Sequence, residues 1–282
     1  MLDVLRVVQR GRSLDRRQRW PRARPGALRR LLGIPHLDLW LLPVAIVLFL
    51  GAWQAVVWLV GYPSFILPAP ADVAAAGQHV LADGTLLRNT RVTISEVFAG
   101  LGLGLLAASL LGYLLAKSQR LERMLAPYLV ASQSVPVVAI APLLIIWFGS
   151  GRLSKVLVCA LIVFFPLLVN IMIGIRSVPP ELRDLMRSLN ASRWQTFHML
   201  ELPAALPVVL GGLRIGVTLA VVGAVVGELV GADQGLGFMI NQARGLFNTP
   251  LVFVATLTLV IITLSLYGAV MALEKALLRW RG

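Results

Sequence analysis

Long apolar segments recur along this chain, and their length restricts what it can fold into. Each contains about 20 residues, which is what a helix needs to cross the roughly 30 Å hydrocarbon core of a bilayer. Hydrophobic residues make up 58% of the sequence, well above the roughly 45–50% of soluble domains. The chain is therefore predicted to be an all-α integral membrane protein with six transmembrane helices. In chain order the predicted spans are 39–60, 92–116, 125–148, 156–175, 206–230 and 251–273.

The third predicted span is interrupted by Pro136 and Pro142. Each removes a backbone N–H donor, so a kinked or locally broken helix is expected there. Together with Ser132 and Ser134, these two prolines could shape a translocation path by exposing backbone groups. A simple packing kink explains the same residues equally well.

Basic residues are divided unequally between the two sets of segments that connect the spans. One set contains 20 Lys and Arg, and the other contains 5. Because Lys and Arg accumulate on the cytoplasmic side of bacterial and eukaryotic membranes, both termini are predicted to be cytoplasmic. The basic set is 1–38, 117–124, 175–205 and 274–282, and the other set is 61–91, 149–155 and 231–250.

Residues 1–38 form an Arg-rich N-terminal segment, and residues 39–282 form the transmembrane domain. The net charge of +13 would suggest nucleic acid in a soluble protein, but ten of the 26 basic residues precede the first span. Topology and contact with anionic lipid headgroups explain them better, so no nucleic-acid partner is expected. Arg29 and Arg30 weakly suggest a twin-arginine leader. The apolar run that follows is longer than that of a signal peptide, so a retained span is favoured.

The chain carries no recognisable catalytic or cofactor-binding motif. It lacks the phosphate-binding loop G-x-x-x-x-G-K-[ST], and no serine, histidine and acid grouping is present. Cys159 is the single cysteine and the three histidines are far apart, so neither a disulfide nor a metal site is expected. The series Gly100, Gly102 and Gly104 fits close helix packing through small residues. A non-catalytic protein without cofactors is predicted.

Three ionisable residues lie within the predicted spans, where charge is costly and function is a default hypothesis. Glu96 and Arg214 lie near span ends, where extension of the side chain to the lipid–water interface is the favoured explanation. Glu228 lies near the outer end of the fifth span. A role in lining or gating the outer mouth and a structural pairing are equally supported for it.

A polar stretch at residues 179–203, called the island below, separates the fourth and fifth spans. Its first half predicts a helix of about ten residues, because Leu182, Leu185, Met186 and Leu189 share the i, i+3, i+4, i+7 spacing of one apolar stripe. Glu181 and Asp184 near its start suit the positive end of the helix dipole.

The second half of the island predicts a reversal followed by another helix. Asn190 tolerates the left-handed conformation that ends helices, and Ser192 three residues before Gln195 forms a capping-box pattern. The second helix is expected to carry Trp194, Phe197 and Leu200 and to be closed by Pro203. The alternative is a loop whose helices lie on lipid headgroups. A specified turn between two capped helices is more than such a loop requires.

The spacing of Asp184-Leu185-Met186, Asn190 and Leu200-Glu201-Leu202-Pro203 matches the signature E-A-A-x3-G-x9-I-x-L-P. The chain resembles the permease subunits of bacterial binding-protein-dependent ABC importers, over most of residues 39–275. With Leu67-Pro68-Ala69-Pro70 upstream, it is most similar to the nitrate/sulfonate/taurine group, which includes carriers of thiamine-precursor pyrimidines. The chain departs from the signature by Asp for Glu at 184, Leu-Met for Ala-Ala at 185–186 and Asn for Gly at 190.

The resemblance implies a type I importer permease (MetI-like) core in the bacterial inner membrane. It implies a dimer, cytoplasmic ATPase subunits, an extracytoplasmic solute-binding protein and surrounding lipid as partners. The expected solute is small and anionic or heterocyclic. A self-sufficient secondary transporter or channel is the alternative, and it would need more intramembrane carboxylates or an inverted repeat. The residues implied in coupling to the ATPase are Glu181, Asp184, Leu185, Met186, Leu189, Asn190, Ser192, Trp194, Leu200 and Pro203.

Overall fold

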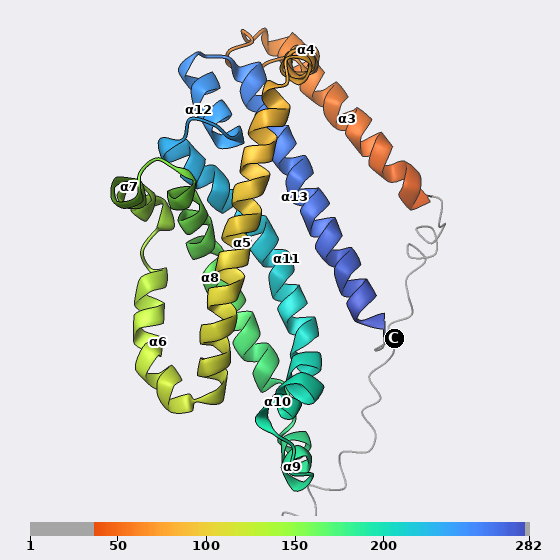
Figure 1. Cartoon of the computed structure of the whole chain (residues 1–282). Helices are drawn as coiled ribbons and strands as arrows, with labels where there is room; N and C mark the ends of the chain where they lie inside the picture. Colours follow the sequence, from red (N-terminus) through yellow and green to blue (C-terminus); the bar gives the residue numbers. More distant parts are fainter. Residues whose placement is uncertain (1–36, 280–282) are drawn as a thin grey trace, which may run out of the picture. The chain divides into compact units, whose positions relative to one another are not determined.

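A computed structural model of the chain describes residues 37–279 (Figure 1). The predicted Arg-rich segment therefore lies almost wholly outside the described residues. Within them the regular structure is helical, as predicted. The chain divides into two compact units after Val56. The first unit contains most of α3 (Leu37–Val60), an apolar helix that covers the first predicted span.

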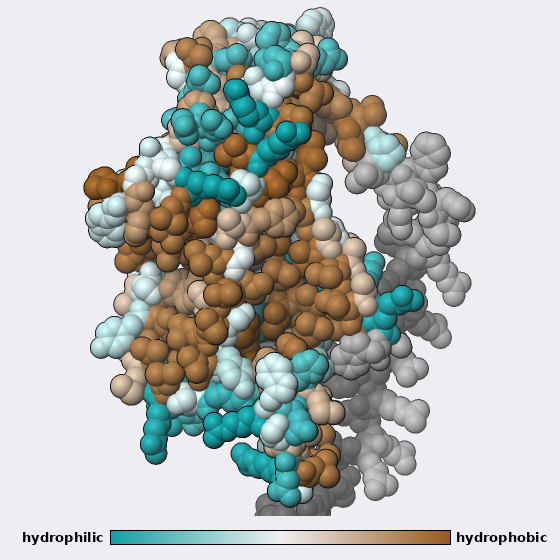
Figure 2. Space-filling model, in the orientation of Figure 1, coloured by the Kyte–Doolittle hydropathy of each residue, from teal (hydrophilic) through white to brown (hydrophobic). Residues whose placement is uncertain are grey.

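Four long helices of the second unit cover four further predicted spans, and these predictions are confirmed. In Figure 1, α5, α8 and α11 run between the end of the unit that carries α9 and the end that carries α12. Apolar side chains cover the middle of this unit in Figure 2, and polar side chains gather at both ends. The four helices are α5 (Thr85–Lys117), α8 (Arg152–Arg176), α11 (Leu202–Gly231) and α13 (Thr249–Leu277).

The predicted third span is broken into α6 (Gln119–Gln133) and α7 (Val137–Phe148), which meet at 90°. Five helices of the described chain are long and apolar enough to cross a membrane, or six if this pair counts as one. The break is at Pro136, the residue before α7, whereas Pro142 lies inside α7. A proline disfavours helical geometry in the residue before it, which explains why α6 ends here.

Glycine and Cys159 allow α5, α8 and α11 to approach closely. A Cβ on Gly100 would collide with the Cys159 side chain, and a Cβ on Gly223 would lie 2.7 Å from the Cys159 Cα. Gly104 is packed against α8 in the same way, whereas a Cβ on Gly102 would meet no atom within 4 Å. Close packing is confirmed for Gly100 and Gly104 and is wrong for Gly102. The Cys159 side chain is a buried free thiol.

Short helices complete the second unit. The helix α4 (Pro70–Ala82) begins with Pro70 at its first position. Residues 231–250 were predicted only as a connection between two spans, and the structure has the helix α12 (Leu236–Gly245) there. It buries Leu236, Met239 and Ala243 against the long helices.

Candidate functional site

The first helix of the island, α9 (Pro180–Ser188), ends in a Schellman motif at Asn190. The N–H of Ala191 donates to the carbonyl of Met186 at 2.9 Å, and the N–H of Asn190 donates to that of Arg187 at 2.9 Å. Asn190 has a φ of 51°, in the left-handed region. Glycine adopts this conformation most readily because it has no side chain, and among the other residues Asn tolerates it best. The predicted reversal at Asn190 is confirmed.

The second island helix starts with the predicted capping box. In α10 (Arg193–Thr196), the Gln195 N–H donates to Ser192 Oγ at 3.2 Å. The Ser192 N–H donates to Gln195 Oε1 at 2.7 Å. These two bonds satisfy backbone donors at a helix start that has no earlier turn to bond them.

The prediction that Pro203 closes this second helix is wrong. From α10 the chain continues through the π-helical turn η1 (Phe197–Glu201) into α11, where Pro203 is the second residue. The Leu202 N–H donates to the carbonyl of Phe197, five residues back. Proline lacks a backbone N–H, and its ring needs space next to the preceding turn. The wider π-turn provides that space, so the helix continues through Pro203.

The island presents an apolar face that the described chain does not cover. Leu182, Leu185 and Leu189 are 43%, 53% and 68% exposed. Trp194 on α10 is 70% exposed, whereas Met186 and Leu200 are half-buried. Glu181 and Asp184 are exposed, and Asp184 pairs with Arg187 at 3.0 Å. Exposed leucines on a short polar helix are typical of a surface that docks into a partner's groove.

A buried carboxylate, Glu201, joins the island to the long helices. It is fully buried and forms an ion pair with Lys117 at the end of α5. The Tyr113 hydroxyl donates to it at 3.5 Å, and Arg183 Nε of α9 lies 3.9 Å from its Oε1. Arg183 also donates to the carbonyl of Ile175 in α8 at 2.7 Å. One carboxylate thereby connects α9, α5 and the start of α11.

Sequence reasoning assigned no role to Glu201, Lys117 or Arg183. The available signal was Glu201 itself, an acid between Leu200 and Leu202 within the importer signature. Its partners are 84 and 18 residues away in the sequence, so spacing gave no indication of the pairs. A second pair at this end joins Arg176 of α8 to Glu122 of α6 at 2.6 Å.

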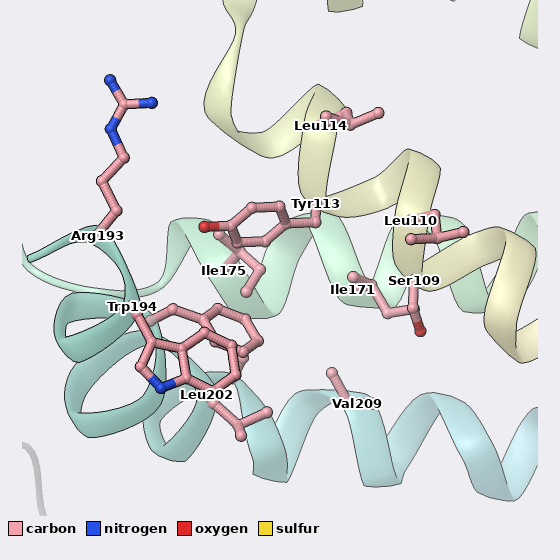
Figure 3. A pocket seen from close by; sticks show the side chains of 12 residues that line it. Ser109, Leu110, Tyr113, Leu114, Ile171, Ile175, Arg193, Trp194, Leu202 and Val209 are labelled. Atoms are coloured by element: carbon pink, nitrogen blue, oxygen red, sulfur yellow. The ribbon is translucent and has the colours of Figure 1, made fainter.

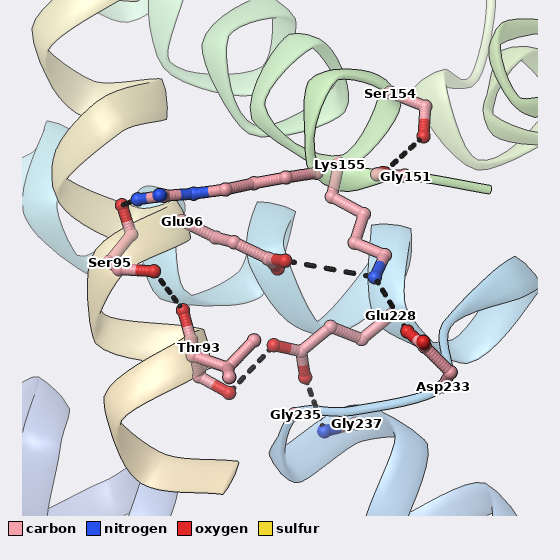
Figure 4. A network of polar contacts seen from close by, with 12 residues as sticks. Thr93, Ser95, Glu96, Gly151, Ser154, Lys155, Glu228, Asp233, Gly235 and Gly237 are labelled. Carbon is pink, nitrogen blue, oxygen red and sulfur yellow. Dashed lines mark hydrogen bonds and ion pairs between the residues drawn. The ribbon is translucent and has the colours of Figure 1, made fainter. Parts of the chain in front are cut away.

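At the opposite end, Glu228 of α11 holds α12 in place (Figure 4). It is 1% exposed and accepts hydrogen bonds from Thr93 Oγ1 at 2.6 Å and from the Gly237 N–H at 2.5 Å. Thr93 Oγ1 in turn accepts from the Leu236 N–H at 2.9 Å. The Gly235 N–H donates to Asn89 Oδ1 at 2.8 Å. The first N–H groups of α12 are thus satisfied by α5 and α11.

Lys155 of α8 lies among acids next to Glu228. Its Nζ is 3.7 Å from Glu96 Oε1 and 3.9 Å from Asp233 Oδ1. Glu96 was expected to extend to the lipid–water interface, and that expectation is wrong because it is only 1% exposed. A cation in a buried helix interface offsets the desolvation of the carboxylate. Arg214 also has a partner, Glu274 of α13, at 2.9 Å.

The residues suggested for a translocation path fall in two places. Ser132, Ser134 and Pro136 lie at the bend between α6 and α7, where both serines are exposed and bond to carbonyls of their own helix. Glu228 lies instead in the buried network with α12. The structure brings the first three together and separates Glu228 from them.

Comparison with known proteins places this architecture among membrane transport components. Residues 100–279 match the family model described as the binding-protein-dependent transport system inner membrane component. The riboflavin transport system permease protein RibX of Chloroflexus aurantiacus is 50% identical over 279 residues, covering 99% of this chain and 97% of that protein. The formylaminopyrimidine transport permease protein ThiX of Halalkalibacterium halodurans is 35% identical, covering 81% and 91%.

Solved structures share the fold. The MetNI methionine ABC transporter in an inward-facing conformation matches with a TM-score of 0.62 and 20% identity, covering 68% of this chain and 96% of that one. An amino acid ABC transporter crystallised with histidines matches with a TM-score of 0.57 and 16% identity, covering 71% and 97%.

Proposed function

The chain belongs to the binding-protein-dependent transport system inner membrane component family, and we propose that it carries an aromatic heterocycle of the riboflavin class. Members are multi-pass, non-catalytic permease subunits of ABC importers for small solutes. ATP hydrolysis belongs to a separate subunit, and a solute-binding protein delivers the solute. Those two partners follow from the family; the solute, the orientation and the coupling residues are proposed below.

The observation that carries the coupling role is the uncovered face of the island. Leu182, Leu185 and Leu189 form an exposed apolar stripe on a helix that projects beyond the long helices. We assign this stripe to a groove on the ATPase, with Met186 at its base. The residues proposed to contact the ATPase or to shape the contact are Glu181, Asp184, Leu185, Met186, Leu189, Asn190, Ser192, Trp194, Leu200 and Pro203.

Glu201 and Arg183 would transmit motion of the docked island. A rotation of α9 displaces Arg183, which is bonded to α8 and lies beside Glu201. Glu201 is paired with α5 through Lys117 and precedes α11 directly. Closure of the ATPase around α9 would therefore move α5, α8 and α11 together. Alternating access requires such a concerted movement of helices.

The island and both termini are assigned to the cytoplasm of the bacterial inner membrane. The Lys/Arg-rich connections support this orientation, because the α5–α6 connection and the island lie at the same end in Figure 1. Two copies are proposed to form the transporter. The exposed serines at the α6–α7 bend are proposed to line its path, together with Pro136.

The riboflavin class is proposed from the relative whose match extends over nearly the whole chain. RibX aligns over 279 residues, whereas ThiX aligns over 229. Uptake of labelled riboflavin and of taurine would be compared in vesicles that contain the permease, its ATPase and its solute-binding protein. Riboflavin uptake that depends on ATP is expected. Taurine uptake with no riboflavin uptake would contradict the assignment of solute and leave the importer role standing.

Coupling is tested at Asn190. Asn190→Val forces a β-branched residue into a left-handed conformation, at a cost of about 1–3 kcal/mol, whereas Asn190→Gly permits the same turn. Substrate-stimulated ATPase activity in vesicles should fall severalfold or more in the valine variant and persist in the glycine variant. Equal activity in both would contradict the claim that this reversal positions the island on the ATPase.

A further inference from the structure

A cavity of about 590 Å³ lies at the α9 end of the molecule, between α5, α8, α10 and α11 (Figure 3). Its wall is apolar, with Leu110 and Leu114 from α5, Ile171 and Ile175 from α8, and Val209 from α11. The proposed coupling role does not use this space. Its size is in the range of small-molecule sites, which commonly have apolar walls and a few polar groups at defined positions.

The polar groups are concentrated at one end of the cavity. Arg193 stands there in Figure 3, with its guanidinium pointing away from the apolar wall. It is exposed and makes no side-chain hydrogen bond or ion pair with any other described residue. Lys117 is close by, with its ammonium 5.5 Å from the centroid of the Tyr113 ring. Lys117 is already paired with Glu201, so Arg193 supplies the positive charge that this end of the cavity offers to an anion.

Aromatic side chains lie between the cationic end and the apolar wall. The Tyr113 ring meets the Phe197 ring edge-on at 5.3 Å, and the Trp194 ring lies 5.8 Å from that of Phe197. Trp and Tyr beside Arg and Lys are the side chains that gather where the bilayer meets water. The composition places this end of the cavity at the depth of the lipid headgroups.

The other side of the cavity joins an exposed apolar stripe on α5. Leu106, Leu110 and Leu114 follow at i, i+4 and i+8 and are 62%, 64% and 54% exposed. Two of the three also line the cavity. A chain of methylene groups could therefore pass from the outer surface of α5 into the cavity without leaving apolar surroundings.

We propose that this cavity binds an anionic phospholipid, with an acyl chain against the apolar wall and the phosphate at Arg193. The ligand must be long and apolar at one end and anionic at the other, and a lipid of the surrounding bilayer has both properties. A small polar solute would make no apolar contacts with the wall, and an uncharged alkyl chain would offer no anion to Arg193. The proposal does not depend on which solute is transported.

The position of the headgroup connects this lipid to the island. Arg193 and Trp194 belong to α10, and Lys117 is the partner of the buried Glu201. A phosphate bound at Arg193 would therefore contact α10, which leads directly into the π-turn that contains Glu201. Occupancy by anionic lipid would hold α10 in place, and the coupling of ATP hydrolysis to transport should depend on the anionic lipid content of the membrane.

Lipid binding is measured on the purified full chain by native mass spectrometry during titration with phosphatidylglycerol and with phosphatidylcholine. The wild-type chain should retain one phosphatidylglycerol in preference to phosphatidylcholine. Arg193→Gln should weaken that binding about fivefold, since one basic residue near a membrane surface contributes on the order of 1 kcal/mol. Arg120→Gln is the matched control, because Arg120 is exposed at the same end and lies outside the cavity.

The acyl-chain half of the site is tested separately. Ser109→Phe fills the cavity and should abolish retention of the lipid, whereas Leu106→Phe, on the exposed stripe outside the cavity, should not. Val209→Phe replaces Ser109→Phe if the latter does not fold. Equal weakening by Arg193→Gln and Arg120→Gln would overturn the proposal, as would equal retention of the two lipids. Displacement of the bound lipid by riboflavin would assign the cavity to the solute instead.

Discussion

Glu228 is predicted to hold α12 against the long helices, and Glu228→Ala should release it. The carboxylate is 1% exposed and accepts bonds from Thr93 Oγ1 at 2.6 Å and from the Gly237 N–H at 2.5 Å. Both donors are buried, and alanine offers neither of them an acceptor. A buried donor left without a partner costs about 1–3 kcal/mol.

The expected loss is therefore about 3 kcal/mol in the free energy that opposes local opening of α12. At about 1.4 kcal/mol per factor of ten, the open state should become about a hundredfold more populated. Glu228→Gln keeps one acceptor oxygen but places an amide NH₂ against the second donor. It should cause roughly half the loss, about a tenfold change.

Hydrogen exchange of the α12 amides measures this opening directly. In detergent or in lipid discs, peptides covering residues 235–246 should exchange faster in Glu228→Ala, and peptides from α8 should not change. Asp233→Asn is the matched control. Asp233 is 88% exposed and lies 3.9 Å from Lys155, so this variant should change α12 exchange by less than about threefold. Unchanged exchange of α12 in Glu228→Ala would refute the reasoning.

Two further predictions concern packing and the charge pair at the α9 end. Gly100→Ala should lower the thermal unfolding midpoint, because its Cβ would collide with Cys159 and such overpacking costs about 1–3 kcal/mol. Gly102→Ala should leave the midpoint unchanged, because its Cβ would meet no atom within 4 Å. Equal effects of the two substitutions would contradict the packing argument. Lys117→Met should destabilise the chain more than Glu201→Gln, since only the first leaves a buried carboxylate short of a cation. In a double-mutant cycle on unfolding midpoints, Glu201→Gln should rescue most of the loss in Lys117→Met, and additive effects would contradict the pairing.

Features that depend on local chemistry could be predicted from the sequence. The five long apolar helices follow from apolar length alone. The reversal at Asn190 and the cap at Ser192 follow from what single side chains do to the adjacent backbone. Proline gave a weaker signal. Pro43, Pro127, Pro166 and Pro207 lie inside helices of the described chain, as Pro142 does. A proline in an apolar segment therefore indicated where a break was allowed, and only the tertiary structure determined that Pro136 was the one used.

The buried charges could not be paired from the sequence. Thr93 and Glu228 are 135 residues apart, and Lys117 and Glu201 are 84 apart. Each pair forms because packing of α5, α8 and α11 brings them together, and that packing depends on contacts such as those of Gly100 and Gly223 with Cys159. Residue type indicated that Glu96 was costly in a membrane. It did not indicate whether the Glu96 carboxylate would reach the lipid–water interface or pair with Lys155 inside the protein.

The same helical run connects the two networks and gives them a common role under the proposed function. Residues Arg193–Gly231 form one continuous run that passes through the π-turn before Pro203. Glu201 lies near its start and Glu228 near its end, roughly 40 Å apart at 1.5 Å per residue. Because the helix is continuous, displacement of α10 by an ATPase would tilt the segment that carries Glu228. The hydrogen bonds of Glu228 to Thr93 and Gly237 are then the contacts at the far end that such a tilt would strain first.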